Sequence, residues 1–280
     1  MRSHSNYYQN KMLKNSYLLA CLLLTGVLYA QENTQSHSPT TITVDELSYT
    51  DEKSGKGSYQ DNQKTGLWTY FYDDQKLWKK GEYDKGKETG TWRIYYKNGN
   101  VRFLENYSNG IRHGKSMAYY EDGKKKLVSN YADGKPDGEF IVYFDDGKKY
   151  TVQHYDKGIK TGKYTEYYHN GKIKTEEFYV IGKPERKYIT YYESGKVKED
   201  GFLKGNSITG EHTTYFENGI VTIKAIMADN RLMEVLERHD KNGNKLDPGT
   251  LKNGNGIFNH YDDNGKLLAA VVFENGRPKK

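Results

Sequence analysis

The chain has 280 residues, with 43 Lys and Arg against 37 Asp and Glu, a formal net charge of +6 and one cysteine. Arg2, Lys11 and Lys14 precede the first acidic residue, so removing this segment takes three charges from +6 and leaves +3. So small a charge, with both signs interspersed, excludes the basic footprint of a nucleic-acid-binding protein, and one cysteine excludes a disulfide framework.

Residues 1–30 have the pattern of a secretory signal peptide. Basic residues precede an apolar stretch from Tyr17 to Tyr29 that is too short to span a bilayer, and Ala30 then supplies the small residue of a cleavage site. Met12 begins a second segment that is already a complete signal, so the true start is Met1 or Met12. We expect an exported protein, in the periplasm or on the cell surface.

Cys21 ends the sequence Leu-Leu-Ala-Cys, which has the look of a bacterial lipoprotein cleavage site. The apolar run continues beyond it to Tyr29, so we expect cleavage after Ala30 and a mature protein without cysteine, with lipidation at Cys21 as the alternative. Residues 31–45 are polar and predict a flexible linker.

A glycine that recurs every 24 residues organises residues 46–280, and a fixed period of this length predicts an array of one short structural unit. We count about nine units, which become degenerate from about residue 186 and lose phase at residues 245–250. Leu267–Phe273, the most apolar stretch after the signal, predicts a covered closing strand. The recurring glycines are Gly99, Gly123, Gly147, Gly171, Gly195, Gly219 and Gly243.

Each unit reads as a β-hairpin. Asn98-Gly99 lies between aromatic and β-branched residues, which favours a two-residue type I′ turn with positive φ at both residues. A second turn, ending at Gly110, links each hairpin to the next. The sequence therefore predicts an all-β fold, an elongated single sheet of antiparallel β-hairpins arranged as a meander or solenoid.

A two-residue turn would pair Tyr95 with Arg102 and Ile94 with Phe103, and alternation then assigns side chains to two faces. The expected buried face carries Trp68, Tyr70, Tyr72, Trp92, Ile94, Tyr96, Phe140, Val142, Phe144, Tyr188 and Tyr192. The opposite face carries one aromatic residue per unit, and a basic side chain opposite a tyrosine can stack on its ring. The candidate binding residues are Tyr95, Tyr119, Tyr143, Tyr167, Tyr191 and Tyr215, with Arg102, Lys126, Lys174 and Lys198.

The sequence predicts neither catalysis nor a metal or cofactor site. Residues 240–247 alternate oxygen-bearing side chains as a calcium loop does, but Gly243 comes too early and Leu251 stands where a closing acid is required, so a hairpin turn fits better. The histidines lack ligand spacing, and no nucleophile lies near a base. We expect no enzyme.

The motif Gly90-x-Trp92-x-x-Tyr95-Tyr96-x-x-Gly99, followed by a tyrosine three residues before Gly110, resembles the MORN-repeat variant family of bacteria. The resemblance extends from residue 58 to residue 276. It implies a binding protein, described for such chains as antitoxin-like, and related arrays are associated with phospholipid contact and scaffolding.

Two functional hypotheses follow. The first is a non-catalytic exported scaffold that binds an unknown protein partner in the bacterial envelope. The second is a surface that binds an envelope glycan or a lipid headgroup through the face that carries Tyr and Lys side chains.

Overall fold

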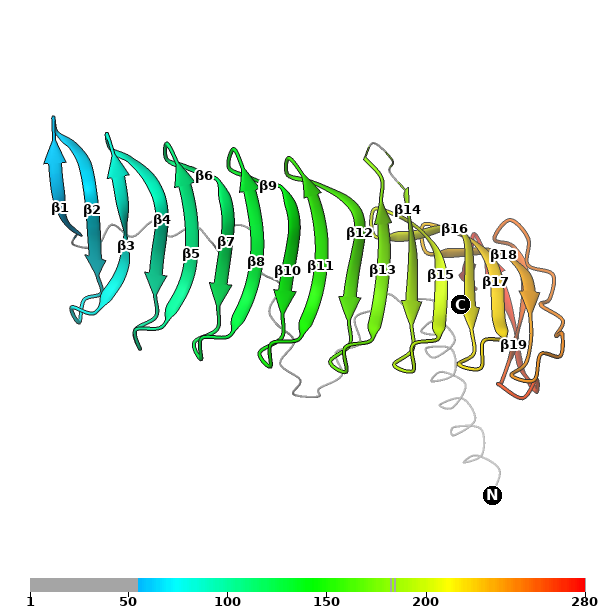
Figure 1. The fold of residues 1–280 in the computed structure, drawn as a ribbon. Coiled ribbons are helices and arrows are strands. Elements are labelled where there is room, and N and C mark those ends of the chain that lie inside the picture. The colour runs from blue at the N-terminus through cyan, green and yellow to red at the C-terminus, as the bar shows by residue number, and fades with distance from the viewer. Residues whose placement is uncertain (1–54, 182, 184, 280) are drawn as a thin grey trace, which may run out of the picture. The chain divides into compact units, whose positions relative to one another are not determined.

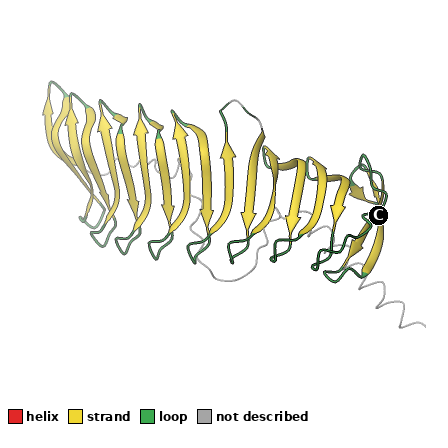
Figure 2. Cartoon of the chain, turned by 45° about the vertical axis from the view of Figure 1, so that its right-hand side comes forward, coloured by secondary structure: helices red, strands yellow, loops and turns green. Residues whose placement is uncertain are grey.

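The computed structural model describes residues 55–181, 183 and 185–279. The predicted signal peptide, Cys21 and the linker lie outside these residues. The described residues form strands joined by turns and contain no helix, so none of them forms a helix that could cross a bilayer (Figure 2).

Two compact units divide the described chain. The N-terminal unit comprises the described residues of 55–186 together with 193–195, and the C-terminal unit comprises 187–192 and 196–279. The N-terminal unit contains β1 (Gly55–Gln60), β2 (Gln63–Phe71), β3 (Leu77–Asp84), β4 (Lys87–Tyr95), β5 (Val101–Ser108), β6 (Ile111–Arg112), β7 (Gly114–Tyr119), β8 (Lys125–Ala132), β9 (Lys135–Pro136), β10 (Gly138–Tyr143), β11 (Lys149–Asp156), β12 (Ile159–Tyr167) and β13 (Ile173–Tyr179).

Strand β14 (Glu185–Tyr191) begins at the end of the N-terminal unit. The C-terminal unit continues with β15 (Val197–Lys204), β16 (Ser207–Tyr215), β17 (Val221–Ala228), β18 (Arg231–Arg238), β19 (Gly256–Tyr261), β20 (Leu267–Glu274) and β21 (Arg277–Pro278).

Strands β1 to β18 belong to one antiparallel sheet of 18 strands that follows chain order, as Figure 1 shows. Within the N-terminal unit β2 pairs with β3, β3 with β4 and β4 with β5, and the series continues in the same way. The predicted all-β meander is confirmed. Each strand meets its sequence neighbours, so stability comes from local contacts between successive units.

Strands β19 to β21 form a separate three-stranded sheet. We predicted Leu267–Phe273 as a covered closing strand. The segment is a strand, β20, but it belongs to the separate sheet, and one of its faces is covered. Val271 and Phe273 are buried, whereas Leu268 and Val272 are exposed, because alternate side chains of a strand point to opposite faces.

The type I′ geometry predicted for the Asn98-Gly99 turn is also wrong. Gly99 has a φ of 91°, but Asn98 is not among the residues with positive φ. The Tyr96 N–H donates to the Asn100 carbonyl at 2.8 Å, and the Gly99 N–H donates to the Tyr96 carbonyl at 3.0 Å. The loop is therefore a type I turn followed by a left-handed glycine, a three-residue connection.

Type I′ turns occur instead at the other end of the strands. Lys85 and Gly86 have φ values of 48° and 77°, and Asn109 and Gly110 have values of 52° and 80°. Both central residues of each turn are left-handed, as this turn type requires. The type I′ turns therefore link successive hairpins and do not occur at Asn98-Gly99. Asn98 stabilises its turn through its side chain, which accepts a hydrogen bond from the Asn100 N–H at 2.9 Å.

Hydrogen bonds between successive hairpins lock the N-terminal unit together. The hydroxyls of Tyr72, Tyr96 and Tyr120 each donate to a backbone carbonyl 23 residues further on, at 2.6 to 2.7 Å. At the opposite ends of the strands, the Gly110 N–H donates to the Glu88 carbonyl at 2.8 Å. These contacts explain why the repeat keeps a tyrosine, and not a phenylalanine, at most of these positions.

The core of the N-terminal unit is a row of aromatic side chains on one face, which we call the tryptophan face. Trp92 is fully buried and packs on Gly81, where a Cβ atom would overlap its indole ring. The ring of Tyr83 lies edge-on 5.0 Å from the Trp92 ring, and the Lys79 ammonium lies over Trp92 at 4.3 Å. The buried members of this cluster are Trp68, Tyr70, Trp78, Trp92, Ile94, Phe103, Ala118 and Leu127.

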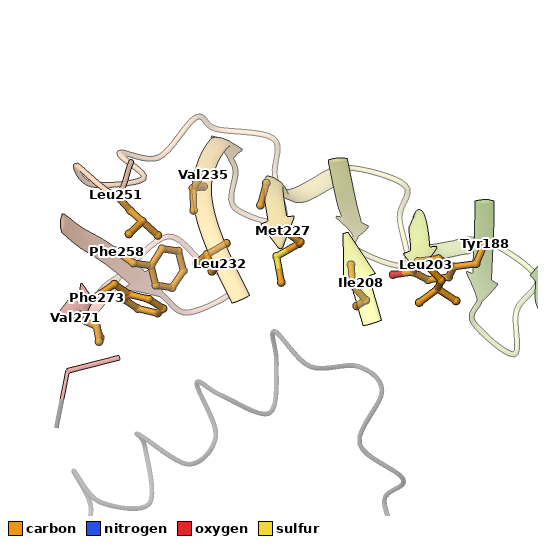
Figure 3. Packing of buried hydrophobic residues seen from close by; sticks show 11 residues of the cluster. Tyr188, Leu203, Ile208, Met227, Leu232, Val235, Leu251, Phe258, Val271 and Phe273 are labelled. Atoms are coloured by element: carbon orange, nitrogen blue, oxygen red, sulfur yellow. The ribbon is translucent and has the colours of Figure 1, made fainter. Parts of the chain in front are cut away.

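The C-terminal unit has its own hydrophobic cluster, in which Phe258 and Phe273 of the small sheet pack with Leu232 and Val235 of β18 (Figure 3). The predicted core residues Trp68, Tyr70, Trp92, Ile94, Phe144 and Tyr188 are buried. The others are half-buried: Tyr72, Tyr96, Phe140, Val142 and Tyr192.

Candidate functional site

The face opposite the tryptophan face carries the predicted tyrosines, and we call it the tyrosine face. In the N-terminal unit its members are Tyr95 on β4, Tyr119 on β7, Tyr143 on β10 and Tyr167 on β12, each half-buried and each the last residue of its strand. The tyrosines therefore line one border of this face, beside the turns that contain Gly99 and its equivalents.

The predicted partners of these tyrosines are shifted by one residue. Tyr95 faces Val101, not Arg102, because the glycine turn is one residue longer than predicted and the register shifts beside it. The pairing of Ile94 with Phe103 is confirmed. The same shift places Tyr119 opposite Lys125, Tyr143 opposite Lys149 and Tyr167 opposite Ile173.

The predicted basic residues consequently contact other groups. The Arg102 guanidinium lies over the rings of Tyr96 and Phe103, at 5.5 and 5.2 Å, and the Lys126 ammonium lies over Tyr120 at 5.6 Å. Lys174 forms an ion pair with Glu166 at 2.9 Å. The structure does not bring Arg102, Lys126 and Lys174 together with the tyrosines that we had assigned to them.

In the C-terminal unit the Lys198 ammonium lies over the ring of Tyr192 at 6.0 Å. Tyr191 is half-buried. Tyr215 faces Val221, and its hydroxyl donates to Asp200 at 2.9 Å. These contacts are structural and hold neighbouring strands together.

A row of cross-strand pairs runs across the middle of the tyrosine face, and the sequence analysis missed it. Lys80 faces Arg93, Arg93 faces Leu104, Leu104 faces Met117, and Met117 faces Val128. We call these five residues the central strip. Directly opposed residues share a face, so the strip places two cations beside three apolar side chains.

The cations of the central strip have no carboxylate partner among the described residues. Arg93 is exposed, and the Lys80 ammonium lies over the ring of Tyr95, 5.7 Å from its centroid. Lys56 on β1 extends the basic end, because it faces Thr69 and Thr69 faces Lys80. Leu104, Met117 and Val128 are half-buried and belong to neither buried hydrophobic cluster of the described chain.

The tryptophan face contains a buried ionic cluster that we had not predicted. Glu105 accepts hydrogen bonds from the Tyr107 hydroxyl at 2.9 Å and from Arg112 at 2.7 Å. Burial raises the pKa of the Glu105 carboxyl, and the Arg112 charge opposes this shift. Glu105 occupies the position that Gly81 holds one repeat earlier. The replacement of a glycine by an acid at the same repeat position is the sequence feature from which this cluster could have been predicted.

The C-terminal unit contains a comparable buried pair. His212 and Glu199 lie 3.2 Å apart, and the ring of Tyr188 stacks on His212. Arg238 is buried between the rings of Phe258 and Tyr261, and burial lowers the pKa of its guanidinium to about 10. We interpret these groups as polar parts of the core, since each packs against buried aromatic rings.

The Asp240 turn uses its acid internally. The Asp240 carboxylate accepts hydrogen bonds from the backbone N–H groups of Asn242 and Asn244, both at 2.9 Å, and from the Asn244 side chain at 2.8 Å. These bonds lower the pKa of Asp240. The segment forms a hairpin turn, and the described residues contain no group of three metal-binding side chains.

The fold and its two faces define a repeat scaffold made of β-hairpins. The model of the MORN repeat variant family matches residues 88–109, 112–133, 160–180 and 187–204, so the chain carries MORN repeats across residues 88–204. The match is narrower than the range of 58–276 over which we noted the resemblance. MORN repeats are generally protein-binding scaffolds.

No curated protein matches the chain. Among solved structures, the chain is similar to the pore of the Tc holotoxin of Photorhabdus luminescens, with 11% identity and a TM-score of 0.18 over 76% of this chain. The match covers 14% of that protein's chain.

Proposed function

We propose that this protein is a non-catalytic, exported scaffold that binds a partner protein in the bacterial envelope. The observation that carries the proposal is the rigid repetition of the hairpins. Hydrogen bonds from Tyr96 and Tyr120 to the following units fix each hairpin against the next, so the half-buried side chains of the tyrosine face are held in place before any partner arrives. A preorganised surface loses less entropy when it binds.

The sequence of residues 1–30 supports export. The MORN repeats imply protein binding, and the bacterial variants are described as antitoxin-like. An exported protein would meet a toxin outside the cytoplasm, so we propose a partner in the envelope. A toxin that is neutralised by binding would be one such partner.

The test is capture from envelope extract with the full chain, carrying a tag at its C-terminus. We expect one protein in a fixed molar ratio to the bait. Fractionation of the producing cells gives a second readout, and we expect the mature chain, shortened by the signal peptide, in the periplasmic or surface fraction. Repeated capture without a stoichiometric protein, or a full-length chain in the cytoplasm, contradicts the proposal.

A glycan or a lipid headgroup is the alternative ligand, and the row of half-buried tyrosines supports it because sugar rings stack on aromatic side chains. Replacing Tyr119, Tyr143 and Tyr167 by Ser removes three rings of this row. If the alternative holds, the triple variant loses binding to peptidoglycan or to liposomes that the unmodified chain retains. Equal binding by both chains excludes it.

A further inference from the structure

The central strip combines positive charge and apolar surface in a fixed order. Lys80 and Arg93 occupy β3 and β4, and Leu104, Met117 and Val128 follow on β5, β7 and β8. With Lys56 on β1, three cations lie at one end of this face. The carboxylates of β3 that share the face are Glu82 and Asp84, two and four residues beyond Lys80, and Asp84 faces Lys87. The strip is therefore basic at the end formed by β3 and β4 and apolar at the end formed by β5, β7 and β8.

The spacing of the strip matches a helix laid across the strands. Neighbouring strands are about 4.8 Å apart, so the four steps from Lys80 to Val128 span about 19 Å. One turn of an α-helix rises 5.4 Å, close to one strand spacing, and about 13 helical residues span the strip. Each turn of such a helix can place one side chain over one strand.

The borders of the strip also suit a helix. Tyr95 and Tyr119 flank it on one side, and the Tyr119 hydroxyl lies 3.5 Å from the Met117 sulfur. Asn106 and Lys115 flank it on the other side, and the Asn106 side chain donates to the Lys115 carbonyl at 2.5 Å. An amphipathic helix has an apolar stripe bordered by polar residues, which this arrangement complements.

We propose that the central strip binds an amphipathic α-helix of a partner protein, with acidic residues in its first turn over Lys80 and Arg93 and an apolar stripe over Leu104, Met117 and Val128. Acidic residues are favoured in the first turn of a helix, so the polarity of the strip also fixes the direction of the bound helix. This inference rests on the proposed protein-binding function and specifies the kind of segment that is bound.

The test is selection of a display library of random 16-residue peptides on the full chain. We expect enriched peptides to carry Asp or Glu one turn before apolar residues at helical spacing. The Lys80→Glu/Arg93→Glu variant should weaken their binding at least tenfold, and raising the salt concentration should weaken binding to the unmodified chain. The matched control Lys252→Glu/Lys266→Glu reverses two exposed charges in the C-terminal unit and should change affinity less than twofold.

The apolar half of the strip is tested with Met117→Gln/Val128→Thr, which should weaken binding at least fivefold at an unchanged melting temperature. Enriched peptides without acidic residues, or equal binding to the charge-reversed variant, overturn the proposal. So does preferential binding of the full chain to phosphatidylglycerol vesicles, or a dimer of the chain that charge reversal dissociates.

The two proposals can fail separately. If capture from envelope extract yields a stoichiometric protein that the charge-reversed variant still binds, the scaffold function stands and the helix site is wrong. If capture yields no protein, the scaffold function fails, while the peptide selection still decides whether the strip recognises acidic helices.

Discussion

The Tyr96 hydroxyl donates a hydrogen bond of 2.7 Å to the backbone carbonyl of Tyr119, 23 residues further along the chain. The bond joins the end of one hairpin to the end of the next, because Tyr96 directly follows β4 and Tyr119 is the last residue of β7. Tyr72 and Tyr120 repeat the contact. Tyr96 and Tyr120 thus connect successive repeats, whereas Tyr95 and Tyr119, which directly precede them in sequence, border the tyrosine face.

The Tyr96→Phe and Tyr120→Phe variants each lose one of these bonds. We expect each to lower the free energy of unfolding by about 0.5–1.5 kcal/mol, the net value of one hydrogen bond. Tyr119→Phe is the matched control, because the Tyr119 hydroxyl contacts the sulfur of Met117 in its own strand and not the next repeat. Urea unfolding followed by circular dichroism measures the difference. Equal stability of the three variants would show that the bonds do not couple the repeats.

A Gly81→Ala substitution tests the packing of the tryptophan face. Gly81 has no positive φ, so the added Cβ is unfavourable only because it overlaps the buried Trp92 ring. We expect a loss of about 1–3 kcal/mol, the usual effect of overpacking. In a Trp92→Phe background the same substitution should be better tolerated, since the smaller ring leaves room. A double-mutant cycle with no coupling energy would contradict this contact.

The Arg112→Leu substitution leaves Glu105 buried without its cation. We expect a loss of about 3–5 kcal/mol at pH 7, as for other broken buried ion pairs. Burial already raises the pKa of Glu105 in the folded state, so the folded chain binds a proton more tightly than the unfolded chain. Stability from this group is therefore gained as the pH falls through the raised pKa, and lost as the pH rises through it.

Loss of Arg112 raises the pKa of Glu105 further, so the deficit of the variant should shrink as the pH falls toward the ordinary glutamate value of about 4.3. Thermal unfolding between pH 4 and pH 8 measures this trend. The Glu105→Gln/Arg112→Leu double variant is the control and should lack the pH dependence. A deficit that is constant over this range would contradict the assigned roles.

The turn assignment is tested at Lys85, whose φ of 48° is unfavourable for lysine. Asparagine tolerates the left-handed region better, so Lys85→Asn should stabilise the fold by about 0.5–1 kcal/mol. At the other turn set, Asn98→Gly should destabilise the fold, because the Asn98 side chain bonds to the Asn100 N–H and to the Glu121 carbonyl. Chemical denaturation measures both changes in the free energy of unfolding, which we expect to have opposite signs. Stabilisation by Asn98→Gly would contradict the type I turn and favour a type I′ turn at Asn98-Gly99.

The repeat period and the alternation of side chains were sufficient to predict the fold class, the faces and most of the core, including Trp92 and Ile94. They were insufficient for the register beside the turns. Asn-Gly is compatible with both a two-residue and a three-residue turn, and the difference of one residue moved Arg102 away from Tyr95 and onto Tyr96.

The central strip was not predictable by the same reasoning. Lys80 and Arg93 lie 13 residues apart in sequence, and their pairing depends on an irregularity at Gly81, where the register of β3 and β4 shifts. The buried pair of Glu105 and Arg112 was not predicted either, because charged residues in a strand of alternating polarity are ordinarily assigned to its solvent-exposed face. Both clusters become visible only once the register is known.

The central claim is that the tyrosine face binds a protein in the envelope, and photocrosslinking from the position of Lys115 tests it most directly. Lys115 is exposed and borders the central strip, and Lys252, exposed in the C-terminal unit, is the control position. With benzoylphenylalanine at each position in living cells, the account predicts one specific protein adduct from position 115 and none from position 252. The absence of a protein adduct from position 115, or the same adducts from both positions, would contradict it.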